Sequence, residues 1–258
     1  MSASPPVQSR LLAVPKAGAG ADEYEDAASV RAEEWPVRAA VADGATESIF
    51  AQAWAETLVK GLCRTSATPE ALATALPDWR ATWASALDDQ ADEMPWYTAA
   101  KAQEGAFATL LGLELRSDGR WRAVGVGDSV LFQLRDAALR RSWPYTDPED
   151  FSNRPMLLSS RAHPECPVPG AVQTVAGRWQ RGDTFLLATD AVAAWLLRAE
   201  PPQEHRPGPR TDPTAARTWD ADAFRDAVAA ARADDRLRND DSTLLVLDVR
   251  GLAETGDE

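Results

Sequence analysis

The chain has 258 residues, of which 45% are hydrophobic and 26% charged, ordinary values for a globular protein that buries a substantial core. Its formal net charge of -13 argues against a nucleic-acid-binding surface, because such a surface requires a basic face. No uninterrupted apolar run approaches the roughly 18 residues of a membrane span, and the N-terminal residues lack the apolar core of a secretory signal. A cytoplasmic protein that contacts neither membrane nor nucleic acid is therefore expected.

Few side chains are available for cysteine or histidine chemistry. The two cysteines, Cys63 and Cys166, lie far apart and fit no metal-binding or redox spacing, which is typical of a reduced protein with incidental thiols. The two histidines, His163 and His205, are too few for a histidine-rich metal site. Any catalytic chemistry is therefore expected to depend on carboxylates.

The first third of the chain predicts strands followed by helices. Strand-like stretches with Gly, Glu and Pro between them cover residues 10–15, 26–33 and 37–43. Apolar residues from 49 to 62 recur at the spacing of one helical face, and Thr46 or Ser48 can cap this helix. A second helix is expected over residues 68–90, broken or kinked at Pro77, and a short third helix over 95–103.

The apolar residues then change from the period of a helix to that of a strand. A meander of antiparallel strands joined by tight turns is expected at residues 105–116, 119–128, 129–136 and 137–144. Further strands are predicted over 171–179, 183–190 and 242–249, and helices over 191–200 and 221–236. This order of elements predicts an α+β sandwich of layers.

A single domain over residues 10–250 accounts for these elements. Residues 1–9 are expected to form a flexible leader and residues 251–258 a flexible tail. A Pro-rich insertion at about residues 200–218 is expected to be an exposed linker.

Four acidic clusters fall at the ends of predicted strands: Glu25–Asp26, Asp43–Gly44, Asp190 and Asp240–Asp241. The strand before Asp190 is nearly continuous apolar sequence, so this carboxylate is expected at the rim of the core. Buried carboxylates need partners, and the neighbouring segments offer few cations. Hard divalent ions such as Mg²⁺ or Mn²⁺, which bind through oxygens, would satisfy several of these carboxylates at once.

Each cluster also has an ordinary structural explanation. Asp43–Gly44 is a common turn pair, and Asp190 can simply cap the following helix. Asn239–Asp241 is typical of a loop before a strand, and Glu25–Asp26 is typical of solvated surface charge. No cluster is sufficient alone, so the prediction of a metal site depends on their order along the chain.

The order of the clusters resembles that of the metal-dependent protein phosphatases of the PP2C type, in particular their divergent bacterial branch. The motifs that carry the resemblance are YEDA, VADGA, VGVGDSVLFQL, DTFLLATDAVAAWL and RNDDSTLLVL. They extend from about Arg10 to Val249, nearly the whole chain. The resemblance implies a four-layer α-β-β-α sandwich, in which two antiparallel sheets are flanked by helices and two metal ions lie in a cleft at one end.

The resemblance also implies a role for the acidic clusters. Asp43 would bridge two divalent ions, either Mn²⁺ or Mg²⁺. Glu25 and the backbone carbonyl of Gly44 would hold one ion, and Asp190 and Asp240 would hold the other.

The implied activity is that of a serine/threonine protein phosphatase that hydrolyses phosphomonoesters through a metal-activated water. Asp26 would orient that water, so Asp26 and Asp43 are the expected catalytic residues. The expected partner is a phosphorylated protein, the substrate of a bacterial Ser/Thr kinase. Two alternatives stay open: a regulatory module that keeps the fold but binds a partner, and a hydrolase of small phosphoesters.

Several positions depart from the family pattern. Ala21 stands where an Arg commonly binds the substrate phosphate, Ala45 stands where animal members have a His, and Tyr24 stands where an Asn is common. Ala21 and Ala45 favour the regulatory module, whereas the intact set of Glu25, Asp43, Asp190 and Asp240 favours the enzyme.

Three further residues are considered and left out of the predicted site. Lys16 or Arg10 could replace the missing Arg, but exposed surface charge is the favoured interpretation of both. Asp128, in the motif VGVGDS, is expected to have a structural role and is not among the predicted metal ligands.

Overall fold

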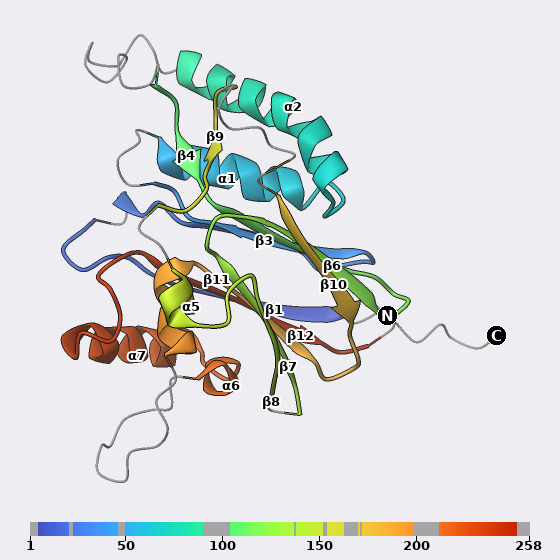
Figure 1. Cartoon of the computed structure of the whole chain (residues 1–258), viewed down its shortest axis with the longest axis vertical. Coiled ribbons are helices and arrows are strands. Elements are labelled where there is room, and N and C mark those ends of the chain that lie inside the picture. The colour runs from blue at the N-terminus through green and yellow to red at the C-terminus, as the bar shows by residue number, and fades with distance from the viewer. Residues whose placement is uncertain are drawn as a thin grey trace.

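The computed structural model describes residues 5–20, 23–45, 50–89, 104–136, 138–151, 154–162, 170, 172–198 and 212–251. Two five-stranded antiparallel sheets form the centre of the molecule (Figure 1). The first sheet contains, in spatial order, β1 (Val7–Val14), β12 (Ser242–Val249), β11 (Thr184–Ala188), β7 (Val130–Arg135) and β8 (Ala138–Trp143). The second contains β10 (Gln173–Arg178), β6 (Arg120–Val126), β5 (Leu110–Leu115), β3 (Val37–Ala42) and β2 (Ala27–Arg31). A small separate sheet pairs β4 (Phe107–Ala108) with β9 (Leu158–Ser159).

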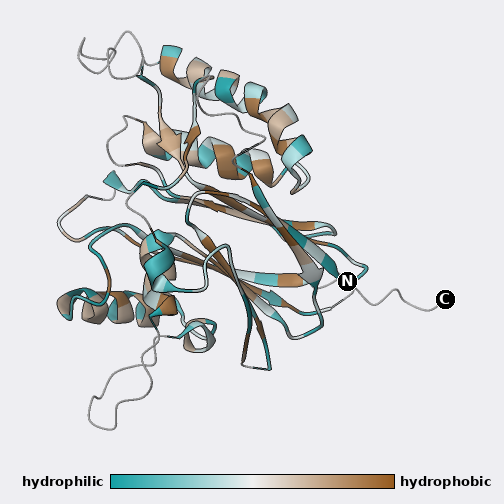
Figure 2. Cartoon of the chain, in the orientation of Figure 1, coloured by the Kyte–Doolittle hydropathy of each residue, from teal (hydrophilic) through white to brown (hydrophobic). Residues whose placement is uncertain are grey.

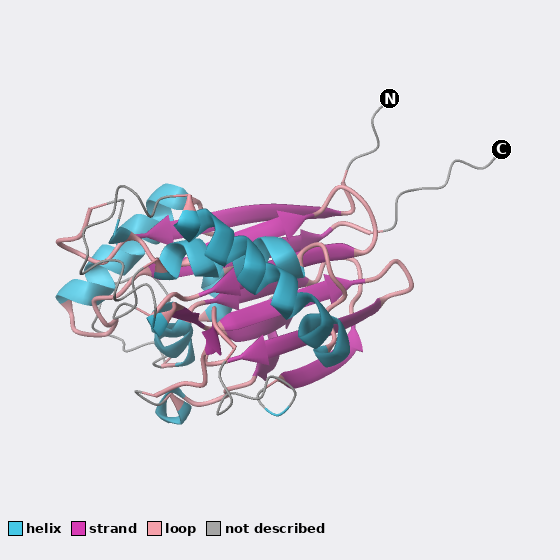
Figure 3. Cartoon of the chain, turned by 90° about the horizontal axis from the view of Figure 1, so that it is seen from above, coloured by secondary structure: helices cyan, strands magenta, loops and turns pink. Residues whose placement is uncertain are grey.

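Helices cover the outer face of each sheet, and seen from above they lie across the strands (Figure 3). The second sheet is covered by α1 (Ala51–Leu62) and α2 (Pro69–Asp88). The first sheet is covered by α5 (Asp190–Leu197), α6 (Pro213–Ala216) and α7 (Ala221–Ala233). A short 3₁₀ helix, η3 (Pro148–Asp150), follows β8. The layers are therefore helix, sheet, sheet and helix, which confirms the predicted α+β sandwich.

Three hydrophobic cores hold these layers together, and Figure 2 shows apolar residues concentrated on the strands and on the helix faces that meet them. Between α1, α2 and the second sheet the large buried side chains include Trp54, Leu58, Leu72 and Trp83. Between the two sheets they include Leu111, Trp121, Phe185 and Leu245. Between the first sheet and its helices they include Phe132, Trp195, Phe224 and Val246. Burial of this apolar area is the main force that stabilises the sandwich.

The helix α2 continues through Pro77, so the predicted break at this residue is wrong. Thr68 caps the start of the helix, where its hydroxyl accepts a hydrogen bond from the backbone N–H of Ala71. Proline removes one backbone hydrogen bond, but Leu76 and Trp79 on either side are buried and pack both halves of the helix on the same core.

The register of the strands brings several strand ends to one edge of the sandwich. In the second sheet, Ala27 at the start of β2 pairs with Ala42 at the end of β3. In the first sheet, Ala188 at the end of β11 pairs with Leu244 near the start of β12 and with Val130 at the start of β7. Because all four acidic clusters directly precede or follow these strand ends, the register gathers them at this edge.

Three boundaries differ from the sequence-based expectations. β1 begins at Val7, which pairs with Val249, so residues 7–9 belong to the first sheet and not to a flexible leader. The expected strand over residues 105–116 is divided at Thr109 into β4 and β5. The end of the expected linker forms α6, which packs on β7 and β8.

Some expectations fall outside the described residues. These are the helix over 95–103, the caps Thr46 and Ser48, residues 1–4, 199–211 and 252–258, and the side chains of Ala21, His163, Cys166 and His205. Among the helices that are described, none has the length and apolar composition required to cross a membrane.

Candidate metal centre

The turn after β3 holds Asp43 and Gly44 against their neighbours. The backbone N–H of Asp43 donates to Thr109 Oγ1 at 3.0 Å, and the N–H of Thr109 donates to the carbonyl of Asp43 at 2.8 Å. A Cβ added to Gly44 would lie 2.8 Å from the carbonyl oxygen of Glu25 and 3.0 Å from the Cβ of Ala51. Only glycine therefore lets this turn approach the backbone of Glu25 so closely.

A cavity of about 220 Å³ opens beside this turn, and carboxylates from several loops line it. Its acidic side chains are those of Asp43, Asp128, Asp190 and Asp240, and Gly44 lies in the same wall. Three of the predicted metal-ligand side chains and the predicted backbone ligand are therefore brought together.

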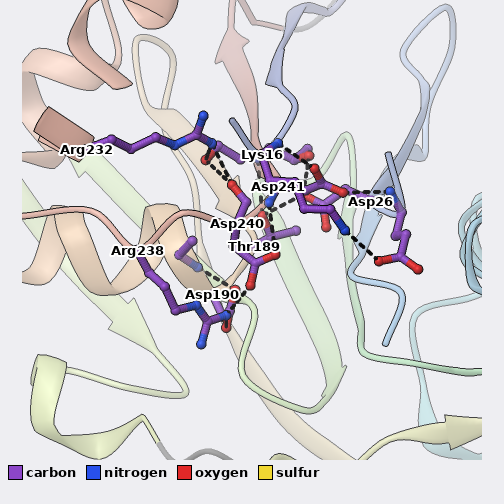
Figure 4. Close-up of polar contacts among 12 residues, drawn as sticks. Lys16, Asp26, Thr189, Asp190, Arg232, Arg238, Asp240 and Asp241 are labelled. Carbon is purple, nitrogen blue, oxygen red and sulfur yellow. Dashed lines mark hydrogen bonds and ion pairs between the residues drawn. The ribbon is translucent and has the colours of Figure 1, made fainter. Parts of the chain in front are cut away.

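Asp190 and Asp240 converge on a single nitrogen atom (Figure 4). The guanidinium Nη2 of Arg238 donates to Asp190 Oδ2 and to Asp240 Oδ2, each at 2.6 Å. Asp190 begins α5 immediately after β11, whereas Asp240 lies in the loop before β12. The two carboxylates, fifty positions apart in sequence, are thus close enough for one cation to contact both.

Asp26 lies beneath the cavity in a network of hydroxyl groups. Its Oδ2 accepts hydrogen bonds from Thr189 Oγ1 at 2.9 Å and from Thr243 Oγ1 at 2.6 Å. The hydroxyl of Tyr24 in turn contacts that of Thr243. Asp26 Oδ1 is buried and has no hydrogen-bond partner among the described residues. Tyr24, a departure from the family pattern, therefore supports the position of Asp26.

Glu25 is placed beside the cavity by Asp241 and Lys16. The carboxylate of Asp241 accepts hydrogen bonds from the backbone N–H groups of Lys16 at 2.8 Å and Glu25 at 2.7 Å. The Nζ of Lys16 forms an ion pair with Glu25 Oε2 at 3.5 Å. Glu25 lines a neighbouring hollow with Lys16, so the structure places it next to the Asp43 cavity but not in its wall.

Burial of the carboxylates, and secondarily their mutual repulsion, sets the electrostatics of the site. Burial raises the pKa of Asp43 well above its usual range, and the nearby carboxylates of Asp26, Asp190, Asp240 and Asp128 raise it further. Burial also raises the pKa values of Asp26 and Asp128 to about 7. These carboxylates need positive charge nearby in order to ionise together at neutral pH.

The acidic cluster fits divalent ions in composition, although its oxygens are not assembled around one point. No group of three or more His, Cys, Asp or Glu side chains among the described residues is arranged to hold a metal ion. The reason is visible in the contacts, because Arg238 lies between Asp190 and Asp240 and Lys16 pairs with Glu25. Within the described part of the chain, however, buried Asp26 Oδ1 and Asp128 Oδ1 have no hydrogen-bond partner, and hard oxygen ligands of this kind suit Mg²⁺ or Mn²⁺.

Two residues that sequence reasoning left aside lie at the site. Asp128 was expected to have only a structural role. It is buried, and its side chain lines the cavity together with the other clustered carboxylates. Lys16 follows the end of β1, and the end of β1 pairs with the start of β12. A prediction of this strand pairing would have placed Lys16 beside the loop that contains Asp240.

Two arginines differ in their relation to the site: Arg238 lines the cavity, whereas Arg10 lies elsewhere, in the first sheet. Arg238 was missed, although its position two residues before Asp240 is a usable signal. Arg10 instead pairs with Asp248 at 3.0 Å within the first sheet, consistent with a structural charge. The hydroxyl side chain of Thr109 and the small side chain of Ala45 also line the cavity.

Comparison with known proteins identifies the family. The sequence model of the family described as protein phosphatase 2C matches residues 21–236. Because this match spans most of the chain, the chain belongs to the protein phosphatase 2C family. No curated protein sequence matches it.

Several solved structures share the fold of this chain. The serine/threonine phosphatase PstP/Ppp of Mycobacterium tuberculosis gives a TM-score of 0.57 at 16% identity, over 95% of this chain and 99% of that one. PppA of Pseudomonas aeruginosa gives 0.57 at 18% identity, over 95% and 98%. The catalytic domain of the phosphatase PstP in complex with two manganese ions gives 0.53 at 20% identity, over 95% and 98%. At these identities the likeness establishes the fold.

Proposed function

We propose that the chain is a metal-dependent serine/threonine protein phosphatase that hydrolyses phosphomonoesters with two Mn²⁺ or Mg²⁺ ions. The observation that carries this proposal is the position of Asp43, whose side chain lines one cavity with those of Asp128, Asp190 and Asp240. Such a concentration of buried negative charge is costly unless cations neutralise it. The two manganese ions in the PstP complex support the same number here.

In the proposed arrangement, the carboxylate of Asp43 would contact both ions. Glu25 and the backbone carbonyl of Gly44 would hold the first ion, and Asp190 and Asp240 would hold the second. The close approach of Gly44 to the Glu25 backbone supports the first pairing. The shared contact of Asp190 and Asp240 with one nitrogen supports the second.

Ions bound by these oxygens supply the Lewis acidity that activates water and neutralises charge on the phosphate in the transition state. Asp26 orients the attacking water. Its Oδ2 is fixed by the hydroxyls of Thr189 and Thr243, while its buried Oδ1 has no partner and is available to accept a hydrogen bond from that water. The carboxylate is thus positioned before substrate binds.

The proposed substrate is a phosphorylated protein, modified by a bacterial Ser/Thr kinase in the cytoplasm. The cavity of about 220 Å³ is smaller than the roughly 300–1,000 Å³ of pockets that enclose small ligands. It therefore favours a phosphorylated side chain presented by a protein surface over a whole small phosphoester. The proposed catalytic domain covers residues 10–250, together with residues 7–9 at the beginning of β1.

Hydrolysis of a phosphothreonine peptide and of p-nitrophenyl phosphate, with Mn²⁺, Mg²⁺ or EDTA, tests this proposal. We expect turnover of both substrates with either ion and none in EDTA, because the carboxylates alone cannot bind or activate phosphate. Asp190→Ala is the matched control, and it should lose at least about 100-fold in rate. Turnover that persists in EDTA, or a folded protein with no turnover at any Mn²⁺ concentration, would contradict the proposal.

A further inference from the structure

Arg238 is the cation that contacts the acidic cavity most directly. Its Nη2 lies 2.6 Å from Asp190 Oδ2 and 2.6 Å from Asp240 Oδ2, so a single nitrogen occupies the position between the two carboxylates. An ion bound by both residues would need that same position. Occupation by the guanidinium and occupation by a metal ion are therefore mutually exclusive.

Hydrogen bonds hold the loop that contains Arg238, whereas the side chain of Arg238 is largely exposed to solvent. Arg232 Nη2 donates to the backbone carbonyl of Asp240 at 2.6 Å and to Ser242 Oγ at 3.1 Å, which holds the loop from behind (Figure 4). The side chain of Arg238 is 57% exposed. A long, exposed side chain on a fixed loop can change partners without disturbing the fold.

We propose that Arg238 is an exchangeable cation of the active site: it neutralises Asp190 and Asp240 until a divalent ion displaces it, and it then binds the phosphate of the substrate. This inference rests on the proposed function. An arginine that competes for two ligands lowers the apparent affinity for the ion, because the ion must first break two charge-assisted hydrogen bonds.

The second half of the proposal follows from what lines the cavity. Arg238 is the one cationic side chain among the described residues in the wall that contains Asp43, Asp190 and Asp240. Once released, its guanidinium stays tethered two residues from Asp240 and offers several N–H donors to the oxygens of a phosphoryl group.

Two binding measurements on the full chain test the proposal without any enzymatic assay. Isothermal titration with Mn²⁺ should show that Arg238→Gln binds the ion about tenfold more tightly than the wild type, because the competing cation is gone. Titration of the Mn²⁺-saturated proteins with inorganic phosphate should show about tenfold weaker binding by Arg238→Gln. A substitution that only perturbed the structure would not change the affinities for Mn²⁺ and for phosphate in opposite directions.

Arg236→Gln is the matched control, because Arg236 lies in the same loop region and pairs with Asp234 at 3.3 Å, away from the cavity wall. Both affinities of this control should equal those of the wild type. Unchanged or weaker Mn²⁺ binding by Arg238→Gln, or unchanged phosphate binding, would overturn this inference without contradicting the proposed function. If neither the wild type nor Arg238→Gln binds Mn²⁺, the inference and the proposed function both fail.

Discussion

Replacement of Asp43 by Asn is expected to reduce phosphatase activity by about a thousandfold or more, while the protein stays folded. Asn has nearly the same shape as Asp but cannot supply two charged oxygens to two ions. The measurement is kcat/KM for a phosphothreonine peptide at saturating Mn²⁺, together with the circular dichroism spectrum of the variant.

The same substitution should make the protein more stable when it is prepared in EDTA. Burial disfavours the charged form of Asp43, and the carboxylates of Asp26, Asp190, Asp240 and Asp128 repel it further, whereas an uncharged amide avoids both costs. The midpoint of thermal unfolding should therefore rise, by about 2 to 4 °C for each kcal/mol in a domain of this size.

Asp222→Asn is a suitable control for both effects, because Asp222 lies on the surface of α7 with its side chain 84% exposed. It should change neither activity nor thermal stability. Full activity in Asp43→Asn would show that this residue does not bridge metal ions, and a lower unfolding midpoint would show that its charge is not destabilising.

Replacement of Trp54 by Ala is expected to lower the free energy of unfolding by about 3 to 5 kcal/mol. Trp54 lies on α1 and is fully buried. Its ring packs edge-on against Trp83 with centroids 6.3 Å apart, and its Nε1 donates to the carbonyl of Leu158 in β9 at 2.8 Å. Removal of the ring leaves a cavity and an unsatisfied carbonyl beneath the second sheet.

Urea unfolding of the wild type, Trp54→Ala, Trp54→Phe and Trp35→Ala separates these contributions. Trp54→Phe keeps most of the buried ring, so it should lose about 1 to 2 kcal/mol, mainly from the hydrogen bond. Trp35, which stacks on Trp179 with centroids 5.2 Å apart, is only half-buried, and its replacement by Ala should cost less than that of Trp54. Equal losses for Trp54→Ala and Trp35→Ala would contradict the role assigned to the α1 core.

The layered fold and the acidic edge could be predicted because both depend on local signals. The strands that end at the site, β3 and β11, are apolar stretches that the sequence pattern identifies. An acidic residue follows the end of each of them, Asp43 after β3 and Asp190 after β11. The period identifies the strand, and the carboxylate after it identifies a charge at the rim of the core. The resemblance of the ordered motifs then implied two antiparallel sheets flanked by helices.

The features that sequence reasoning missed depend on contacts between distant segments. The break of the 105–116 strand at Thr109 follows from its hydrogen bonds with Asp43, which no local pattern reveals. Pro77 is tolerated because flanking side chains of α2 are buried in a shared core. The approach of Arg238 to Asp190 requires β11 and β12 to pair in register, a long-range arrangement. β9, with two residues, is too short to show a period.

Anomalous diffraction from crystals soaked in Mn²⁺ tests most directly whether this acidic edge binds two divalent ions around Asp43. We expect two strong manganese peaks that share the carboxylate of Asp43, one next to Glu25 and Gly44 and the other next to Asp190 and Asp240, with Arg238 displaced. Fully occupied manganese sites elsewhere, and none in contact with Asp43, would contradict this expectation.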